Sequence, residues 1–405
     1  MRTLALSFAF STALLIAGCG GAGGGDPPSK FTIAVIGDVP YGTTPTDTTE
    51  SLLHPHLVSS INADTDAAFV VHVGDIHSGK QFCTDTYDNQ IANDWKAFTK
   101  PMVYTPGDNE WTDCHKTGEG GGSYSASSGA INYIVDSNGN KVDYQGGDPI
   151  ANLTLVRTIF FSQPGKDFTG KMDVHSQARE FDPAFPADAA YVENVWFERN
   201  AILFVTLNMP GGSNNDTDVW YGAPAMSAAQ TQEVANRSAA NLRWLDTAFK
   251  RAVASFDSAV VIAIQADMWD VDSKTAAHLT QYKQFVDGIA AKAKDFGRPV
   301  ILFNGDSHTF RSDNPLVSGA PCIIEPSSGA DAVTCTASIM PGGNPVDPYT
   351  NQPNGYNVPN FHRVVVHGST TPLEWLKLTV DPNNTGTAVT PTSFGPFSWQ
   401  RIKVQ

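Results

Sequence analysis

The chain has 405 residues, of which 41% are hydrophobic, and its formal net charge is −15 at pH 7. This length exceeds one average domain but suits a single α/β domain with insertions. The acidity argues against a nucleic acid duplex as a partner, because phosphate backbones are recognised by basic surfaces. An anionic substrate would need metal ions or nearby arginines to offset the negative field.

The N-terminus predicts an export signal over residues 1–18. Arg2 precedes an apolar stretch of about fifteen residues, which is too short to span a bilayer. The stretch ends in Ile-Ala-Gly-Cys and resembles the lipobox of bacterial lipoproteins, which implies that Cys19 is lipidated; a plain secretory signal is the alternative. Residues 19–29 are Gly-rich and predict a flexible tether. We therefore expect a location in the bacterial cell envelope, lipid-anchored at the outer membrane or periplasmic face, or secreted, with membrane contact through the lipid only.

Four more cysteines follow, which is an even number. In an oxidising compartment we expect Cys83 to pair with Cys114, and Cys322 with Cys335, because each pair brackets a loop beside a strand-end acid. Four free buried thiols are the alternative interpretation.

The elements expected after the tether alternate between strand and helix. They are a strand to Ile36, a helix over 47–62, a strand to Val73, a helix over 88–99 and a strand to Thr105. This βαβαβ order implies a parallel sheet and an α/β fold. Residues 30–405 are expected to form one domain, in which residues 111–190, rich in Gly, Ser, Asn and Asp, are an insertion or lid with one short helix near 151–160.

Regular patterns return after the insertion. Two strands are expected around a turn at Arg199-Asn200, and Ser227 with Gln230 forms a capping box that predicts the start of a long helix. A further helix is expected over 274–295, and the last elements are closing strands at 362–368 and 374–380. Such strands complete a sheet more often than they form a second domain.

Apolar runs that stop at an aspartate recur along the chain, at Asp38, Asp75, Asp108, Asp267 and Asp306. Each run has the length and composition of a buried strand. Ligands bind at the carboxyl ends of strands in open α/β sheets, so these acids are expected to converge on one crevice. Clustered carboxylates favour a metal site built from oxygen ligands. The alternative for any single residue is a helix cap or a turn.

The order of these motifs, GD, GD, GDNE, QAD and GDSH, resembles the calcineurin-like metallophosphoesterases, a superfamily that includes the purple acid phosphatases. The resemblance runs from Asp38 to His308 and suits a divergent lipoprotein member. It implies a four-layer α/β/β/α sandwich with a binuclear metal centre. The implied reaction is hydrolysis of a small phosphate mono- or diester by metal-activated water.

The first three motifs match the family in part. Asp38 matches the first acid, although Pro40 stands at a histidine position, where neighbouring Tyr41 is a candidate to fill the space. Asp75 matches the acid that bridges the metals. In the third motif Asp108 takes the place of a ligand asparagine, and Glu110 matches.

The most consequential departure is at Asn109, which takes the place of the catalytic histidine. Its amide can hydrogen bond to a phosphoryl oxygen but cannot protonate a leaving group, which forfeits a factor of about 100 or more. The catalytic residues implied by the resemblance are Asn109, Glu110 and His308.

The later motifs complete the implied ligand set. Gln265 stands where a lone histidine is expected, with Asp267 as a second candidate; Asp306 replaces the first histidine of the last motif, and His308 matches the second. The implied metal ligands are Asp38, Asp75, Asp108, Gln265, Asp267, Asp306 and His308. The resemblance implies two divalent ions. Oxygen ligands with one imidazole favour Mn or Mg, with Fe, Ca or Zn as alternatives.

Three other residues are candidates for substrate binding. His77 follows the second motif, but a loop-facing histidine is equally expected there. Asn208 ends a strand, where a turn-capping role is the alternative. Arg311 could bind phosphate in bidentate fashion, although a surface salt bridge is the more common role.

The sequence leaves a second class of function open. A degenerate member of the family would keep the fold and bind a partner without hydrolysis, and the replaced histidines favour this alternative. A serine hydrolase is disfavoured because the chain has no G-x-S-x-G motif, and there is no P-loop. The oligomeric state is not predicted.

Overall fold

The computed structural model describes residues 28–270, 280–336 and 355–404. The expected signal at 1–18, Cys19 and most of the tether lie outside the described residues. The described part of the chain is a mixed α/β structure with two large sheets and one small one, which confirms the expected class. None of its helices is long and apolar enough to cross a membrane.

The first sheet has seven strands, and its central part is the expected βαβαβ unit. β1, β2 and β3 run parallel, and β15 is antiparallel to β1. Helices α1 (Thr49–Ala63) and α2 (Asp85–Trp95) connect the parallel strands. The strand order is β16 (Val389–Thr390), β17 (Ser393–Phe394), β18 (Phe397–Lys403), β15 (Glu374–Val380), β1 (Phe31–Ile36), β2 (Ala67–His72) and β3 (Met102–Tyr104).

The second sheet has nine strands, and its central strands β8, β9, β10 and β14 are parallel. The order is β13 (Val333–Thr334), β12 (Ile323–Ile324), β11 (Arg311–Asp313), β14 (Phe361–Val365), β10 (Val300–Asn304), β9 (Ala259–Ala263), β8 (Ile202–Thr206), β7 (Val195–Arg199) and β6 (His175–Ser176). Thus the two closing strands separate, because β14 joins this sheet and β15 joins the first.

Two long helices accompany the second sheet. α6 (Ala228–Ala254) begins where the capping box predicts, with the Ser227 side chain accepting a hydrogen bond from the Gln230 N–H. α8 (Lys283–Phe296) covers the later part of the helix expected over 274–295, and residues 274–279 lie outside the described residues.

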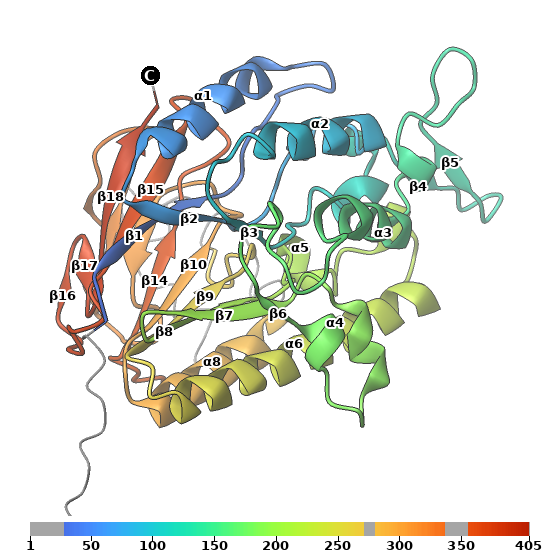
Figure 1. Ribbon diagram of the computed structural model, residues 1–405. Helices are drawn as coiled ribbons and strands as arrows, with labels where there is room; N and C mark the ends of the chain where they lie inside the picture. Colours follow the sequence, from blue (N-terminus) through green and yellow to red (C-terminus); the bar gives the residue numbers. More distant parts are fainter. Residues whose placement is uncertain (1–27, 271–279, 337–354, 405) are drawn as a thin grey trace, which may run out of the picture.

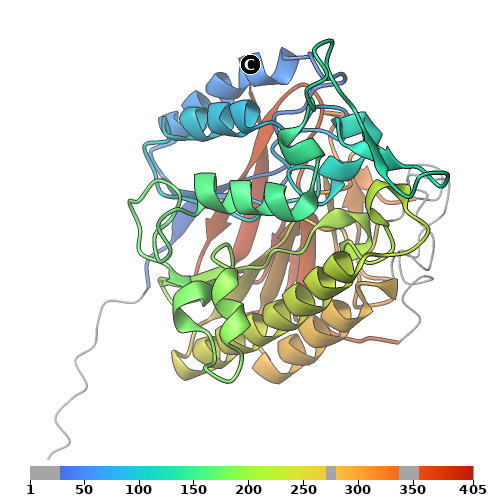
Figure 2. The same cartoon turned by 90° about the vertical axis from the view of Figure 1, so that its right-hand side faces the viewer.

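Three hydrophobic clusters position these elements. Alternating strand residues divide between two faces, so that Ile33 and Val35 of β1 belong to the same cluster as the second sheet's Ile301 and Phe303. The opposite face of the first sheet packs on α1, α2 and α3 (Pro149–Phe160), and that of the second sheet packs on α6 and α8. Figure 1 shows α1 and α2 above the strands and α6 and α8 below them, and Figure 2 shows the same order after a quarter turn. Each sheet is therefore buried on both faces, as the continuous apolar runs require.

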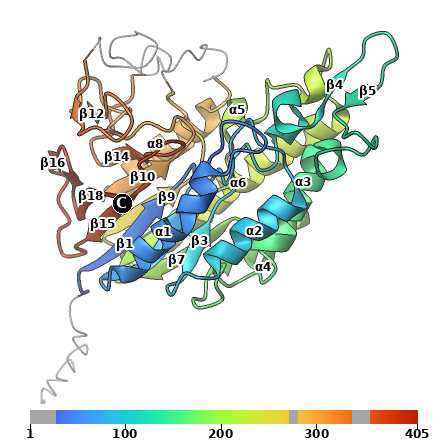
Figure 3. The same ribbon diagram turned by 90° about the horizontal axis from the view of Figure 1, so that it is seen from above.

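Residues 111–190 contain more structure than their composition predicts. The expected helix is α3 (Pro149–Phe160), and its Val156 and Phe160 pack in the same cluster as Trp95 of α2. The small sheet, β4 (Gly122–Tyr124) and β5 (Ile131–Tyr133), projects at the end of the molecule opposite β16 (Figures 1 and 3). The shorter helices of the chain are α4 (Gln177–Glu180), α5 (Gly211–Asn214) and 3-10 turns at Asp113–His115, Thr117–Glu119, Tyr144–Gly146, Pro186–Ala190 and Trp220–Gly222.

Candidate metal centre

The strand-end acids come from both large sheets. Asp38, Asp75 and Asp108 follow β1, β2 and β3 of the first sheet. Gln265 follows β9, and Asp306 and His308 follow β10, in the second sheet. Since these strands are parallel within each sheet, their carboxyl ends meet at one edge.

The backbone turns sharply at several of these positions. The φ angles of Asp38, Asp75, Asp306 and His308 are 52°, 59°, 72° and 61°. Left-handed backbone is uncommon for residues other than glycine, although Asp and His tolerate it better than most. Such conformations cluster at functional sites, where surrounding structure holds them in place.

Asp38, Asp75 and His308 form a group of potential metal ligands at this edge. One ligand atom from each lies within 4.8 Å of the others. His308 Nε2 is 3.6 Å from Asp38 Oδ1, and Asp38 Oδ2 is buried without a hydrogen-bond partner among the described residues. A buried carboxylate oxygen without a partner is costly, and a cation would remove that cost. The residues therefore fit a divalent cation.

Asp108 and Asp306 meet across a glycine. Asp108 Oδ2 and Asp306 Oδ1 each lie 2.6 Å from the point where a Cβ of residue 211 would stand. Only glycine fits at Gly211, which begins α5, because any side chain would overlap both carboxylates. This second pair adds two oxygen donors beside the first group.

Tyr41 contacts both Asp75 and His308 of the first group of potential ligands. Its hydroxyl donates to Asp75 Oδ2 at 2.6 Å, accepts from Asn109 Nδ2 at 2.9 Å and lies 3.2 Å from His308 Nε2. The resemblance assigned no role to this residue beyond filling the space of the absent histidine at Pro40. In the sequence, the available signal for these contacts was the position of Tyr41, three residues after the strand-end acid Asp38.

Two side-chain amides donate to the acids. Asn109 donates from Nδ2 to Asp75 Oδ2 at 3.1 Å and from its backbone N–H to Asp75 Oδ1 at 3.3 Å. Gln265 donates from Nε2 to Asp75 Oδ2 at 3.1 Å and to Asp108 Oδ1 at 2.9 Å, while its oxygen accepts from the Gly211 N–H. Gln265 thus turns its NH₂ group toward the carboxylates in this structure.

Burial and mutual repulsion shift the titration of the acids. The pKa of Asp75 is well above its usual range because of burial and then the charges of Asp108, Glu110 and Asp38. Burial likewise raises the pKa of Asp38, and burial with the charge of Asp113 raises the pKa of Asp108 to about 7. Acids in this state must either hold protons or gain a cation.

Glu110 and Asp267 each have hydrogen-bond or ion-pair partners outside the group of Asp38, Asp75 and His308. Glu110 Oε1 accepts from the Tyr104 hydroxyl and from the Gly107 N–H, so Glu110 holds the turn before Asp108. Asp267 pairs with Arg311 at 2.6 Å and with Arg363. Burial alone would raise the pKa of Asp267, but these two guanidiniums hold it below its usual range. Its backbone N–H donates to Asp306 Oδ2 at 2.9 Å, which orients that ligand candidate.

The candidate substrate residues lie outside the cleft lining. Arg311 is buried in its ion pair with Asp267. Asn208 is buried and donates to Glu193 Oε1 at 2.9 Å. His77 is buried with Nδ1 3.3 Å from the Ser78 carbonyl oxygen.

A cleft of about 350 Å³ opens over the acid cluster. Lys80, which no sequence motif singled out, places a lysine side chain in its wall. The lining residues are Tyr41, Gly42, Thr43, Asp75, Ser78, Gly79, Lys80, Asp108, Asn109, Asp306, His308 and Ser369.

All of these lining residues lie outside 111–190, the segment expected to be an insertion or lid.

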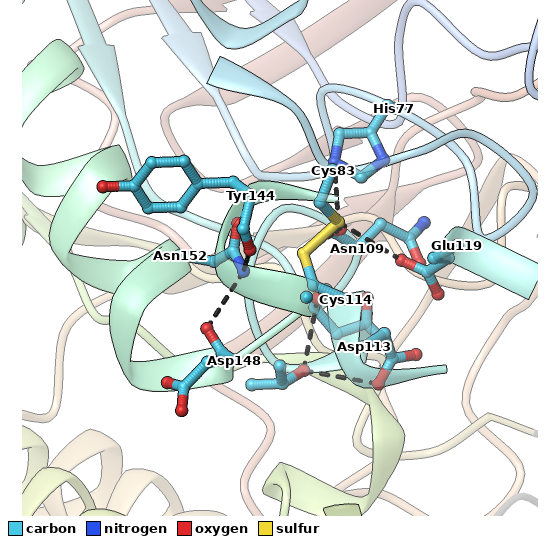
Figure 4. Close-up of a disulfide and its surroundings, with 12 residues drawn as sticks. His77, Cys83, Asn109, Asp113, Cys114, Glu119, Tyr144, Asp148 and Asn152 are labelled. Atoms are coloured by element: carbon cyan, nitrogen blue, oxygen red, sulfur yellow. Dashed lines mark hydrogen bonds between the residues drawn. A yellow bond between two sulfur atoms is a disulfide. The ribbon is translucent and has the colours of Figure 1, made fainter. Parts of the chain in front are cut away.

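The four cysteines of the described chain form the two expected disulfides, Cys83–Cys114 and Cys322–Cys335. The first lies beside the acid cluster. Both of its sulfurs contact the carbonyl oxygen of Asn109, at 3.3 Å from Cys83 and 3.5 Å from Cys114. Figure 4 shows the bond with His77, Asn109 and Glu119 around it. The disulfide therefore fixes the backbone of the residue that donates twice to Asp75.

A separate group of Asp113, His115 and Asp218 also brings potential ligand atoms within 4.8 Å of one another. Lys116 Nζ already lies 2.5 Å from Asp113 and 2.6 Å from Asp218. His115 Nδ1 accepts from the Tyr221 N–H, which leaves the ring proton on Nε2. Lysine rather than a metal thus balances the two carboxylates, so we assign no metal to this group.

No model of a protein family matches the chain, and no curated protein matches it. Several solved structures match the chain. One of them is purple acid phosphatase PPD1 from seeds of yellow lupin (Lupinus luteus), with 12% sequence identity and a TM-score of 0.35. The match covers 88% of this chain and 51% of the lupin chain, so this chain spans about half the length of that protein.

Proposed function

We propose that this protein is a metal-dependent phosphoesterase that hydrolyses phosphate mono- or diesters. The observation that carries the proposal is the group of Asp38, Asp75 and His308, with ligand atoms within 4.8 Å of one another and a partnerless buried oxygen on Asp38. The two sheets and their flanking helices are proposed to form the four-layer sandwich that the sequence motifs imply.

Five residues would hold the ions in this proposal: Asp38, Asp75, Asp108, Asp306 and His308. Four carboxylates and one imidazole are a hard donor set, which favours Mn or Mg. Bound divalent ions would supply activated water and charge stabilisation for the phosphoryl group.

The remaining residues would orient the ligands and the substrate. Tyr41, Asn109 and Gln265 donate to Asp75 and fix its carboxylate. Lys80 and His308 line the cleft, where each can donate a hydrogen bond to a phosphate oxygen. Asn109 can also bind such an oxygen but cannot protonate a leaving group, so esters with good leaving groups would react faster.

We also propose a location in the cell envelope. The support is the export signal in the sequence and the two disulfides of the structure, since disulfides persist in oxidising compartments. Lipidation of Cys19 belongs to the same proposal.

The second candidate is a binding module without turnover. Its support is that His308 is the one imidazole of the cluster Asp38, Asp75 and His308, and that Asn109 stands where the resemblance implies an acid catalyst. A module of this kind would bind metal or phosphate and release the ester unchanged.

Metal content and turnover separate the two candidates. Residues 30–405 are stripped with chelator, reloaded with Mn or Mg, and measured for bound metal by elemental analysis and for hydrolysis of p-nitrophenyl phosphate and bis(p-nitrophenyl) phosphate. We expect two ions per chain and turnover in the wild type. Asp75→Asn and His308→Ala should lose activity by about 100-fold or more and keep the circular dichroism spectrum.

Two surface variants serve as matched controls. Asp173→Asn and His56→Ala change exposed residues of the same types, so their activity should equal that of the wild type. Bound metal without hydrolysis of either ester would support the binding module. Failure to bind metal would contradict both the enzyme and its proposed ligand set.

A further inference from the structure

A second chamber of about 410 Å³ adjoins the cleft over the acid cluster. His308 and Ser369 line both spaces, so the two are neighbours at these residues. A volume of this size falls within the range of about 300–1,000 Å³ that is typical of small-molecule sites.

The chamber is fixed to the acid cluster by the backbone after β14. The Gly368 N–H donates to the His308 carbonyl at 3.0 Å, and the Ser369 N–H donates to the Asp38 carbonyl at 2.7 Å. A Cβ at Gly368 would lie 2.4 Å from Cβ of Asp38, so only glycine permits this close approach. A group in the chamber would therefore stay at a set position relative to a phosphate held over the acids.

The inner wall is a rigid charged network. His367 Nδ1 lies 2.7 Å from Glu325 Oε1, and both side chains are buried. Glu325 also accepts from the Phe310 N–H at 2.8 Å and pairs with Arg401. Arg401 pairs in turn with Glu374 at 2.5 Å, so the buried charges alternate in sign. His367 Nε2 also lies 3.4 Å from the Thr370 carbonyl oxygen, so both ring nitrogens hold the imidazole in place in the chamber wall.

The rest of the wall is rich in hydroxyl groups. Among the described lining residues there is no benzene or indole ring. Six of them are serine or threonine: Ser307, Thr309, Ser327, Ser328, Ser369 and Thr370. Hydroxyls donate and accept, so they match the hydroxyls of a sugar or polyol. A nucleobase would require a stacking surface, and an acyl chain would require apolar walls.

We propose that this chamber, lined by His367 and the six hydroxyl side chains, binds the alcohol portion of the substrate, and that this portion is a small polyhydroxylated group such as a polyol or monosaccharide. The inference rests on the proposed function, because the acid cluster supplies the phosphate end. It assigns the substrate class as sugar or polyol phosphates.

The test blocks the chamber and compares two substrates. Ser327 is exposed at the chamber wall, so Ser327→Trp fills the space without disturbing the buried core. In the metal-loaded protein we expect kcat/KM for glucose 6-phosphate to fall by about tenfold or more, and kcat/KM for p-nitrophenyl phosphate to change by less than about threefold. Ser128→Trp, at an exposed site near the small sheet, is the matched control and should change neither value.

A second variant tests the charged wall. His367→Asn keeps a hydrogen-bonding side chain and removes the imidazole, and its metal content and melting temperature report whether the fold is intact. We expect the same selective loss on glucose 6-phosphate. Equal losses on both substrates, or no loss on either, in both variants would overturn the inference.

Binding separates failure of this inference from failure of the proposed function. Glucose 6-phosphate and inorganic phosphate are titrated into metal-loaded protein by calorimetry. Tighter binding of glucose 6-phosphate, lost in Ser327→Trp, without hydrolysis would support the chamber and refute the esterase. Hydrolysis of p-nitrophenyl phosphate, together with equal affinity for the two ligands, would refute the chamber and leave the esterase in place.

Discussion

Asp75 accepts hydrogen bonds from three side chains at one oxygen, Oδ2, and still lies among other acids. The donors Tyr41, Asn109 and Gln265 are neutral, so they orient the carboxylate without balancing the charge of the cluster. Neighbouring Asp38 has a buried oxygen without any such donor in the described structure. At the scale of single residues, the cluster is therefore arranged for a cation rather than for stability of the metal-free protein.

Removing one buried charge from the acid cluster should make the metal-free protein more stable. In chelated protein, Asp38→Asn is expected to raise the free energy of unfolding by about 1–3 kcal/mol, because it removes a buried charge with an unpaired oxygen. The same variant should gain little or no stability from added Mn. Thermal melts of the wild type and the variant, with chelator and with Mn, measure both effects; a chelated variant less stable than the chelated wild type would contradict the argument.

The pH dependence of the metal-free protein follows from the same cluster. The pKa of Asp108 is raised to about 7 by burial and then by Asp113, so the folded state binds the proton more tightly than the unfolded state does. The free energy of unfolding therefore falls as pH rises from about 4 to 7, at up to roughly 1.4 kcal/mol per pH unit. We expect chelated protein to melt at a lower temperature at pH 8 than at pH 5.5.

Bound metal should reverse this trend. Ligands must lose their protons to bind a cation, so metal affinity should increase over the same pH range. Asp108→Asn should flatten the slope in chelated protein, and Asp173→Asn should leave it unchanged. A chelated wild type whose melting temperature rises between pH 5.5 and pH 8 would be the contrary result.

At the scale of elements, the loops after the strands need fixing as much as the side chains do. The Cys83–Cys114 disulfide joins the loop after β2 to the loop after β3, and both sulfurs contact the Asn109 carbonyl. The Cys322–Cys335 disulfide joins the segments at β12 and β13, which contribute no residue to the lining of the cleft over the acids. Comparing the two disulfides therefore separates the effect of a bond beside the acid cluster from the effect of a bond away from it.

We expect the double variant Cys83→Ser/Cys114→Ser to lower Mn affinity by about tenfold or more, besides losing about 2–4 kcal/mol of stability. Cys322→Ser/Cys335→Ser should lose stability without this change in affinity. Calorimetric Mn titration of both double variants, at a temperature where both are folded, checks the difference. Amide hydrogen exchange at residues 109–114 gives a measure that does not depend on metal; equal behaviour of the two variants would refute the positioning role.

At the scale of the whole molecule, the proposed ligands belong to different sheets. Asp38, Asp75 and Asp108 end strands of the first sheet, whereas Asp306 and His308 end a strand of the second. The cluster of apolar residues between the sheets holds them together, but the acids repel one another at this edge. A cation at the centre would therefore cross-link the two sheets.

Metal should accordingly stabilise the complete fold. At a free Mn concentration about 100 times the dissociation constant, we expect a gain of about 2.7 kcal/mol and a single melting transition at higher temperature. Differential scanning calorimetry with and without chelator measures the shift. Asp75→Asn is the control that should show none, and a shift of equal size in this variant would place the metal elsewhere.

Sequence by itself indicated the longer central strands, the mixed α/β class and the favoured pairing of the four cysteines. Long apolar runs ending in acids show where parallel strands stop, because both faces of such strands are buried, and this holds for β1, β2, β3, β9 and β10. The cap at Ser227 similarly marks the start of α6, since a cap is a local interaction.

Only the tertiary structure decided which acids face one another. Asp267 looks like the other strand-end acids in the sequence, yet Arg311 and Arg363 surround it, and Arg363 lies in a distant strand. The contacts of Tyr41 and the chamber at His367 escaped detection for the same reason, because their partners come from loops far apart in the chain. Local patterns report the backbone of each strand, whereas the partners of a side chain depend on how the two sheets pack.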